Sequence, residues 1–120
     1  MLRILVIDDS PTEMHIITNM LKKHGHQFIT AEDGNEGISV AKNEKPDLIL
    51  MDVVMPNLNG FKATRSLSKD PETKDIPVVI LSNKSMPTDK MWGEKQGAKD
   101  YLYKPIDESL LINTINRLVA

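Results

Sequence analysis

Short apolar runs alternate with amphipathic stretches along the chain. The apolar runs occupy residues 3–7, 27–31, 47–51, 77–81 and 100–103. The stretches between them carry hydrophobic residues at helical spacing, as Met14, Ile17 and Leu21 illustrate. Strands that alternate with helices in this way form a parallel sheet with crossover helices. The pattern therefore predicts an α/β fold built from five strand–helix units.

Capping and turn residues predict where the helices begin and end. Ser10-Pro11-Thr12-Glu13 combines a capping box with a proline at the first helical position, and Gly25 is a left-handed stop. The later helices are expected to open near Asp33, Phe61, Pro87 and Asp107. In the last helix, the apolar stripe is predicted to contain Leu110, Leu111, Ile115 and Leu118.

Composition and charge narrow the classes of protein to consider. The 120 residues are enough for one domain, residues 1–120, and 40% of them are hydrophobic. A net charge of −2 gives no electrostatic reason to expect nucleic-acid or membrane-surface binding, and the lack of cysteine excludes thiolate chemistry. No signal peptide or membrane-length apolar stretch is evident. We therefore expect a cytoplasmic domain without membrane insertion.

Four of the apolar runs end on polar residues of different kinds. Asp8-Asp9 follows the first, Asp52 the third, Ser82 the fourth and Lys104 the fifth. Parallel strands bring their carboxyl ends to one edge of the sheet, which is where such sheets bind ligands. Each residue alone would be an ordinary cap, turn or surface residue, but together they are typical of a functional site.

The residue types at this edge indicate a particular chemistry. Three carboxylates repel one another unless a hard cation lies among them, and Mg²⁺ prefers oxygen ligands and retains water. A carboxylate beside a lysine and a hydroxyl that could hold phosphate oxygens favours a phosphoryl acceptor.

These motifs resemble the receiver domain of two-component response regulators. The matching residues follow one another in the family's order: Asp8-Asp9, Asp52, Met55-Pro56, Gly60, Ser82 and Lys104-Pro105. The resemblance covers the whole chain. It implies a flavodoxin-like (βα)5 doubly wound sheet of strand order 2-1-3-4-5.

The resemblance also implies roles for single residues. Asp52 would be the phosphoacceptor, and Asp9, Asp52 and the Val54 carbonyl would hold Mg²⁺ or Mn²⁺, with Asp8 acting through water. Ser82 would bind a phosphoryl oxygen, and Lys104 would pair with the phosphorylated aspartate. Ser82, Tyr101 and Lys104 would form the switch, and the Lys104-Pro105 bond is typically cis in the family.

Segments outside the site resemble the stand-alone receivers of twitching-motility, type IV pilus chemosensory systems more closely. They are 10–14, 58–61, 63–65, 92–93 and 96–98. This implies a monomeric phosphoacceptor switch that is not an enzyme, lacks an effector domain and receives phosphate from a histidine kinase. Its output would be a protein partner at the fourth helix, fifth strand and fifth helix, or removal of phosphate from a shared kinase.

Some residues depart from the commonest receiver pattern. Asn83 replaces a small residue, which raises the question of whether Tyr101 can turn inward beside it. Val54 and Lys84 lie where fast-turnover receivers carry groups that orient water, and we expect these two residues to slow dephosphorylation.

Two rival functions from other classes are open at this stage. A haloacid-dehalogenase-like Mg²⁺-dependent phosphatase needs Asp-x-Asp after its first strand, where this chain has Asp8-Asp9-Ser10. A flavodoxin-like electron carrier needs a hydroxyl-rich phosphate loop there. Turnover of p-nitrophenyl phosphate would reveal the phosphatase, and a visible absorption spectrum would reveal the electron carrier.

Other residues are assigned more ordinary roles. His15, His24 and His26 share no ligand spacing with a carboxylate and are interpreted as surface or capping residues. Met86 and Met91 are interface candidates, and Trp92 is either packed under the fourth helix or displayed to a partner.

Overall fold

Five parallel strands and five helices alternate strictly along the chain in the computed structural model, which describes residues 2–119. Their bounds are β1 (Arg3–Ile7), α1 (Pro11–Lys23), β2 (Gln27–Ala31), α2 (Gly34–Glu44), β3 (Leu48–Asp52), α3 (Gly60–Lys69), β4 (Val78–Ser82), α4 (Pro87–Lys95), β5 (Asp100–Tyr103) and α5 (Glu108–Leu118). The sheet order is β2-β1-β3-β4-β5, as predicted. None of the helices in residues 2–119 has the length and apolar character that a membrane span requires.

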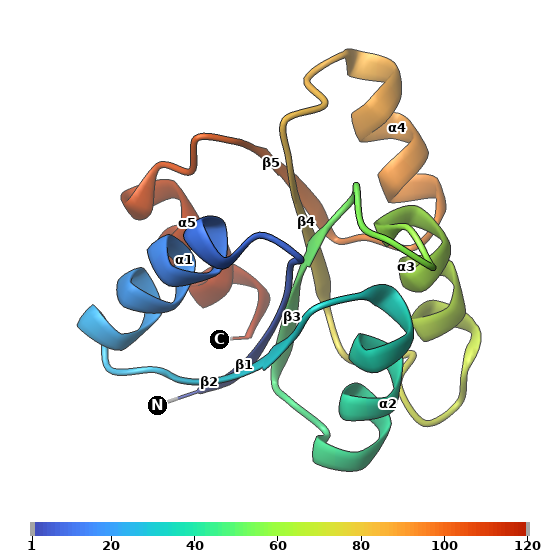
Figure 1. Ribbon diagram of the computed structural model, residues 1–120, viewed down its shortest axis with the longest axis horizontal. Helices are drawn as coiled ribbons and strands as arrows, with labels where there is room; N and C mark the ends of the chain where they lie inside the picture. Colours follow the sequence, from blue (N-terminus) through green and yellow to red (C-terminus); the bar gives the residue numbers. More distant parts are fainter. Residues whose placement is uncertain (1, 120) are drawn as a thin grey trace.

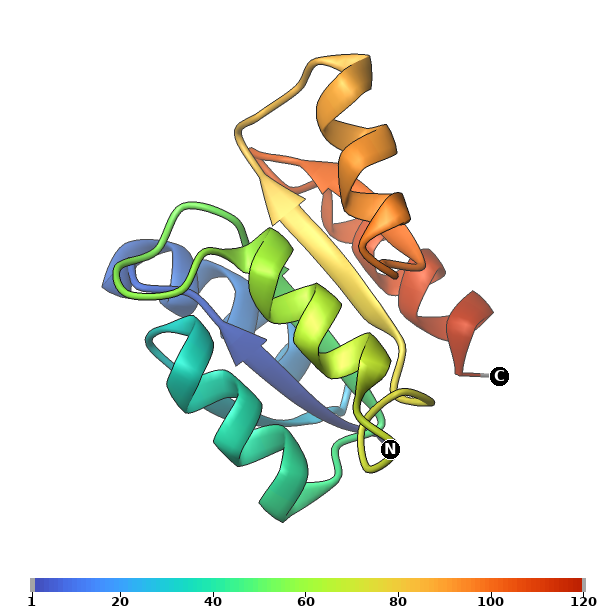
Figure 2. The ribbon, with the colours of Figure 1, turned by 90° about the vertical axis from the view of Figure 1, so that its right-hand side faces the viewer.

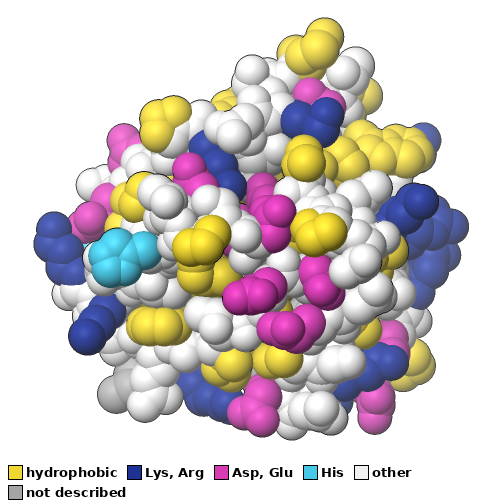
Figure 3. Space-filling view, viewed as in Figure 1, with side chains coloured by type: hydrophobic (Ala, Val, Ile, Leu, Met, Phe, Trp, Pro, Cys, Tyr) yellow, Lys and Arg dark blue, Asp and Glu magenta, His cyan; other side chains and the backbone are white. Residues whose placement is uncertain are grey.

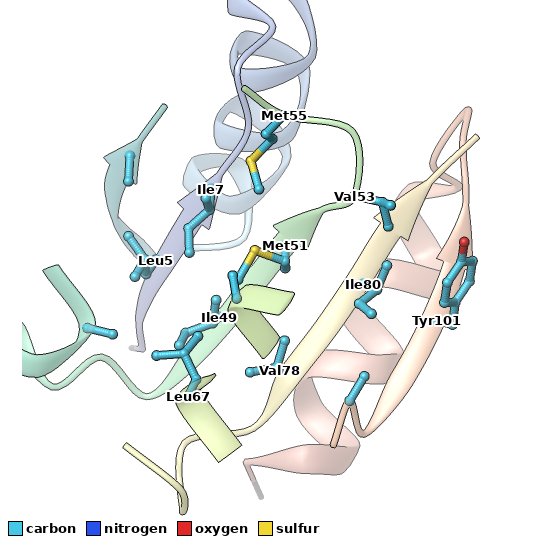
Figure 4. Close-up of a cluster of buried hydrophobic side chains, with 14 residues drawn as sticks. Leu5, Ile7, Ile49, Met51, Val53, Met55, Leu67, Val78, Ile80 and Tyr101 are labelled. Carbon is cyan, nitrogen blue, oxygen red and sulfur yellow. The ribbon is translucent and has the colours of Figure 1, made fainter. Parts of the chain in front are cut away.

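The helices cover the sheet in two layers. α1 and α5 lie on one face, and α2, α3 and α4 lie on the other (Figures 1 and 2). Side chains alternate between the faces along each central strand. In β1, for example, Ile4 and Val6 join the α1/α5 cluster, and Leu5 and Ile7 join the cluster under α2–α4 (Figure 4). Both faces of the central strands are thus buried, which explains why their sequences are continuously apolar.

The helices begin at or near the predicted residues, and α3 begins at Gly60, one residue before the predicted Phe61. The side chains of Asp33, Asn59 and Asp107 each accept a backbone hydrogen bond three residues on. Gly25 is left-handed, with a φ of 79°, directly after the α1 C-cap His24.

The predicted capping box at α1 forms only in part. Ser10 Oγ accepts a hydrogen bond from the Glu13 backbone at 3.3 Å, but Ser10 N donates to Asp8 Oδ1, at 2.9 Å, instead of to the Glu13 side chain. The Glu13 carboxylate is therefore free to turn elsewhere.

The predicted stripe of α5 is wrong at Leu110, which is 52% exposed. Leu110 lies about 100° around the helix from Leu111. Leu111, Ile112 and Ile115 are buried against the sheet instead.

Candidate functional site

Residues from four strand ends meet in one open cavity at the carboxyl edge of the sheet. Asp8 follows β1, Asp52 ends β3, Ser82 ends β4 and Lys104 follows β5. The cavity measures about 290 Å³, and its walls are Asp8, Asp9, Ser10, Glu13, Asp52, Val54, Ser82, Asn83, Lys84 and Lys104. Acidic side chains gather near the centre of the corresponding face (Figure 3). All the sequence-predicted site residues except Tyr101 line this cavity.

Lys104 is the ionic centre of the site. Its side chain is 5% exposed, and its Nζ lies 3.0 Å from Asp8 Oδ2 and 3.3 Å from Asp52 Oδ1. Burial alone would lower the pKa of Lys104, but the carboxylates of Asp8 and Asp52 outweigh it and raise that pKa above the ordinary value. Lys104 is therefore a permanent cation in this site. The Lys104–Pro105 peptide bond is cis, as predicted.

Asp52 lies at the floor of the cavity with 12% of its side chain exposed. Burial, followed by the nearby Asp8 carboxylate, raises the pKa of Asp52 to about 6, although Lys104 opposes the shift. At neutral pH Asp52 is therefore a carboxylate in a site where negative charge is costly. Such a group gains from a cation or from modification of its oxygen.

The three aspartates form an oxygen-only donor set. Carboxylate oxygens of Asp8, Asp9 and Asp52 lie within 4.8 Å of one another. Asp8 is buried and Asp9 is exposed, so the set opens toward solvent. Within residues 2–119, Lys104 is the only residue that forms ion pairs with Asp8 and Asp52, so the three carboxylates leave an excess of negative charge that a divalent ion would balance. Hard oxygen ligands at this spacing fit Mg²⁺.

Val54 and Lys84 lie at the rim of the cavity, where sequence analysis placed the residues that set phosphate turnover. The Val54 side chain is 66% exposed, and Lys84 is also exposed. The histidines lie elsewhere. Among residues 2–119, the aspartate cluster is the only group of potential metal ligands. His24 contacts Glu108 Oε2 at 2.9 Å, and His26 Nδ1 accepts a bond from Leu2 N.

Ser82 and Tyr101 are joined through the backbone of Lys84. Ser82 is buried, and its Oγ accepts a hydrogen bond from Lys84 N at 3.0 Å. The Tyr101 hydroxyl donates to Lys84 O at 2.8 Å, with the ring only 3% exposed (Figure 4). The Asn83 side chain is exposed, so it leaves room for Tyr101 inside the fold.

Glu13 is a site residue that sequence analysis missed. Its Oε2 lies 4.0 Å from Lys104 Nζ, because Asp8 has replaced it as the acceptor for Ser10 N. The signal was present in the sequence, since a residue in the first turn of α1 lies at the same sheet edge as the strand ends.

Comparison with known proteins assigns the family. Residues 4–116 match the response regulator receiver domain. This chain belongs to the response regulator receiver family. The receiver is 59% identical to protein PilH of Pseudomonas aeruginosa, over 100% of this chain and 99% of that protein. It is 37% identical to response regulator PleD of Caulobacter vibrioides, over 97% of this chain and only 26% of PleD.

Solved receiver structures agree with this assignment. The receiver superposes on chemotaxis protein CheY4 of Vibrio cholerae with a TM-score of 0.91 and 30% identity, covering 98% of both chains. The receiver domain of a sensor histidine kinase from Pseudomonas aeruginosa gives a TM-score of 0.91 at 28% identity, over 98% of this chain and 97% of that one. That structure has a magnesium ion coordinated in its active site cleft.

Proposed function

We propose that this protein is a single-domain phosphoacceptor switch that takes a phosphoryl group from a histidine kinase onto Asp52. The observation that carries the proposal is the cavity in which Asp52 shares Lys104 with Asp8 and faces Ser82 and Asp9. The match to the response regulator receiver domain supports the same role.

In the proposed transfer, an Asp52 carboxylate oxygen attacks the phosphorus of the kinase phosphohistidine. The new O–P bond forms as the N–P bond breaks, and the electron pair of that bond returns to the imidazole nitrogen, which takes up a proton. Lys104 Nζ, already 3.3 Å from Asp52 Oδ1, remains beside the product as a fixed cation. Ser82 Oγ can donate to a phosphoryl oxygen by turning its hydroxyl hydrogen toward the cavity.

A divalent metal completes the proposed site. Asp9, Asp52 and the Val54 carbonyl would hold Mg²⁺ or Mn²⁺, with Asp8 acting through water. The ion would supply positive charge against the phosphoryl oxygens. Asp8 also holds Lys104 in place at 3.0 Å, so this carboxylate has a positioning role that does not depend on metal.

The proposed output begins at Ser82 and Lys104. Phosphorylation adds about −1.5 to −2 charges and three acceptor oxygens at Asp52. Ser82 is bonded to Lys84 N and Lys104 follows β5, so movement of either residue would change the face formed by α4, β5 and α5. A protein partner would read that face. Removal of phosphate from a shared kinase is the second output that the same site allows.

We also propose a role in type IV pilus twitching motility, for which the similarity to PilH is the support. The protein would act there as a cytoplasmic monomer. Complementation tests this role. The native gene should restore normal twitching to a Pseudomonas aeruginosa strain that lacks PilH, and the Asp52→Asn gene should not. Equal complementation by both genes would separate the pilus role from phosphorylation.

Phosphorylation itself is tested by mass. Acetyl phosphate with Mg²⁺ should add one phosphoryl group to the native protein and to Asp75→Asn, a matched change at an exposed aspartate outside the cavity. Asp52→Asn should remain unmodified. A phosphoryl group on Asp52→Asn would overturn the assignment, and beryllofluoride should mimic the phosphorylated state only when Asp52 is present.

A further inference from the structure

α3 and the adjoining flank of α4 lie side by side on the α2–α4 face of the sheet (Figure 2). Ser68 Oγ of α3 donates a hydrogen bond to the Gln96 carbonyl, at 2.8 Å, just after α4. Near the start of α3, Phe61 packs toward Gly93 of α4. The two helices therefore form one continuous surface.

α3 contributes a row of exposed cations to this surface. Lys62, Arg65 and Lys69 are exposed and line a hollow of about 380 Å³, and α3 contains no acidic residue. Arg65 lies on the α4 side, since it is one turn from both Phe61 and Ser68. Asp70, at the end of the hollow, is already paired with Lys42 at 2.9 Å.

α4 contributes an apolar centre. Met91 is 67% exposed and Trp92 is 52% exposed, and both line a hollow of about 230 Å³ together with Thr88 and Lys95. Hydrophobic side chains gather over the α4 side of the molecule, next to Lys and Arg side chains over α3 (Figure 3). By helical periodicity, Lys90 and Glu94 lie on the other side of the inward-facing Gly93.

The charges of this surface are not neutralised within residues 2–119. No carboxylate of these residues forms an ion pair with Lys62, Arg65, Lys69 or Lys95. This local excess of positive charge lies on a chain whose net charge is −2. We define the α3–α4 surface as Lys62, Arg65, Lys69, Met91, Trp92 and Lys95.

We propose that the α3–α4 surface binds an acidic segment of a partner protein that places an apolar side chain beside Trp92. Tryptophan and arginine are the side chains most often found at the energetic centres of protein interfaces. A row of cations beside an apolar hollow complements a row of acidic residues beside an apolar anchor. The proposal does not depend on phosphorylation of Asp52, and the surface lies on the opposite flank of α4 from Lys90 and Glu94.

Two other classes of ligand fit the surface less well. A nucleic acid would bring its phosphates near a chain of net negative charge that also carries an acidic site at the sheet edge. A bilayer is flat and takes up protruding apolar groups, whereas Met91 and Trp92 border a hollow.

Trp92 is the single tryptophan of the chain, so its fluorescence reports directly on this surface. The probe is a synthetic amphipathic helical peptide with Leu and Phe on one face and Glu along the adjoining flank of that face. Titration into the 120-residue protein should shift Trp92 emission to shorter wavelength and saturate. The same peptide with Lys in place of Glu should bind at least about tenfold more weakly.

Substitutions test whether the peptide binds at the α3–α4 surface. Arg65→Glu should weaken binding of the acidic peptide by about tenfold or more, while the matched single change Lys90→Glu, on the other flank of α4, should not. For Trp92→Ala, anisotropy of a labelled acidic peptide should show lost binding. Unchanged circular dichroism and unchanged Asp52 phosphorylation would show that each variant is folded.

Several results would overturn the proposal. One is an unshifted Trp92 emission with the acidic peptide, and another is equal binding of the Glu and Lys peptides. Tighter binding to single-stranded DNA, or to vesicles containing phosphatidylserine, would assign the surface to a nucleic acid or a membrane instead. Self-association that Trp92→Ala abolishes would assign it to a second copy of the chain.

Discussion

The Tyr101 hydroxyl donates a hydrogen bond to the backbone carbonyl oxygen of Lys84, at 2.8 Å. On the other side of the same residue, Lys84 N donates to Ser82 Oγ at 3.0 Å. Two hydrogen bonds therefore hold the loop after β4 at Lys84. The Lys84 carbonyl is bonded to Tyr101 of β5, and the Lys84 amide is bonded to Ser82. A phosphoryl oxygen that draws the Ser82 hydroxyl toward the cavity would act on a loop that Tyr101 already restrains.

Tyr101→Phe should release that loop at a modest cost in stability. The ring stays buried, but a hydrogen bond worth about 0.5–1.5 kcal/mol is lost and the Lys84 carbonyl is left to water. Burial raises the pKa of Tyr101, so the native hydroxyl remains a donor well above neutral pH. Urea unfolding should show the loss, and amide exchange at residues 83–86 should accelerate. Tyr103→Phe, at a 41% exposed ring, is the control and should change neither.

Lys104→Ala should permit some phosphorylation of Asp52 but blunt the conformational response. The nucleophile is intact, whereas the charge-assisted contact that would draw β5 toward the phosphoryl group is absent. Intact mass gives the extent of phosphorylation, and amide chemical-shift changes across α4, β5 and α5 give the response. A phosphorylated Lys104→Ala protein with the full native response would contradict the coupling role of Lys104.

Metal should stabilise the folded protein. An ion that binds only the folded state at a hundredfold excess over its Kd adds about 2.7 kcal/mol. Asp9→Asn should raise stability without metal, because it removes one of three neighbouring carboxylates, and should reduce the gain from Mg²⁺. Melting with Mg²⁺ and with EDTA measures both effects. A melting temperature indifferent to millimolar Mg²⁺ would count against the site.

The stability of the metal-free protein should carry a pH dependence from Asp52. Its pKa is about 6 in the folded state against an ordinary 3.8, so the folded protein holds this proton more tightly. The resulting stabilisation is full below pH 3.8 and is lost as the pH rises through 6, by roughly 1.4 kcal/mol per unit of pKa difference.

Asp52→Asn removes that dependence. The variant should therefore gain stability relative to the native protein as the pH rises from 4 to 7, whereas Asp75→Asn should not. Magnesium affinity of the native protein should rise over the same interval, since the proton and the metal compete for the Asp52 carboxylate. Parallel stability curves for the native protein and Asp52→Asn would refute the raised pKa.

Phosphorylated Asp52 should lose its phosphate slowly. Hydrolysis needs a water in line with the O–P bond, and the exposed Val54 side chain offers it no hydrogen bond. One positioning contact can be worth one to a few kcal/mol, or roughly tenfold to a hundredfold in rate. Phosphate release from Val54→Asn, Lys84→Glu and the double variant should be faster than native, with the double variant fastest. Release within seconds from the native protein, unaccelerated by either change, would contradict this.

Local patterns along the chain were sufficient to predict the order of elements and the residues that gather at the sheet edge. The apolar runs marked the strands, and the polar residues after four of the five runs reached the cavity, because parallel strands place their carboxyl ends together. One departure arises where two neighbouring carboxylates compete for one backbone donor. Glu13 lost Ser10 N to Asp8, and that exchange depends on a contact between a strand end and a helix start.

The side-chain positions around Tyr101 could not be read from residue types. Asn83 was expected to hinder an inward Tyr101, yet Asn83 is exposed and the Tyr101 ring is buried. Leu110 is apolar but lies one position away from the inward stripe of α5. At Asn83 and Leu110, burial depends on where the residue lies on its loop or helix and not on its residue type.

The start of α3 is built against the backbone of the phosphoacceptor itself. Gly60 N donates to Val53 O at 2.8 Å, and a Cβ at Gly60 would lie 1.9 Å from Asp52 O. A methyl group cannot fit there, so Gly60→Ala would push Asp52 out of line with Lys104. The backbone of Asp52 and Val53 is therefore packed directly against the start of α3, whereas the loop after Ser82 is tied to β5 through the Tyr101 side chain. Movement of the Asp52 backbone would thus carry the start of α3 with it, whereas β4 and β5 would be reached through the side chains of Ser82 and Lys104.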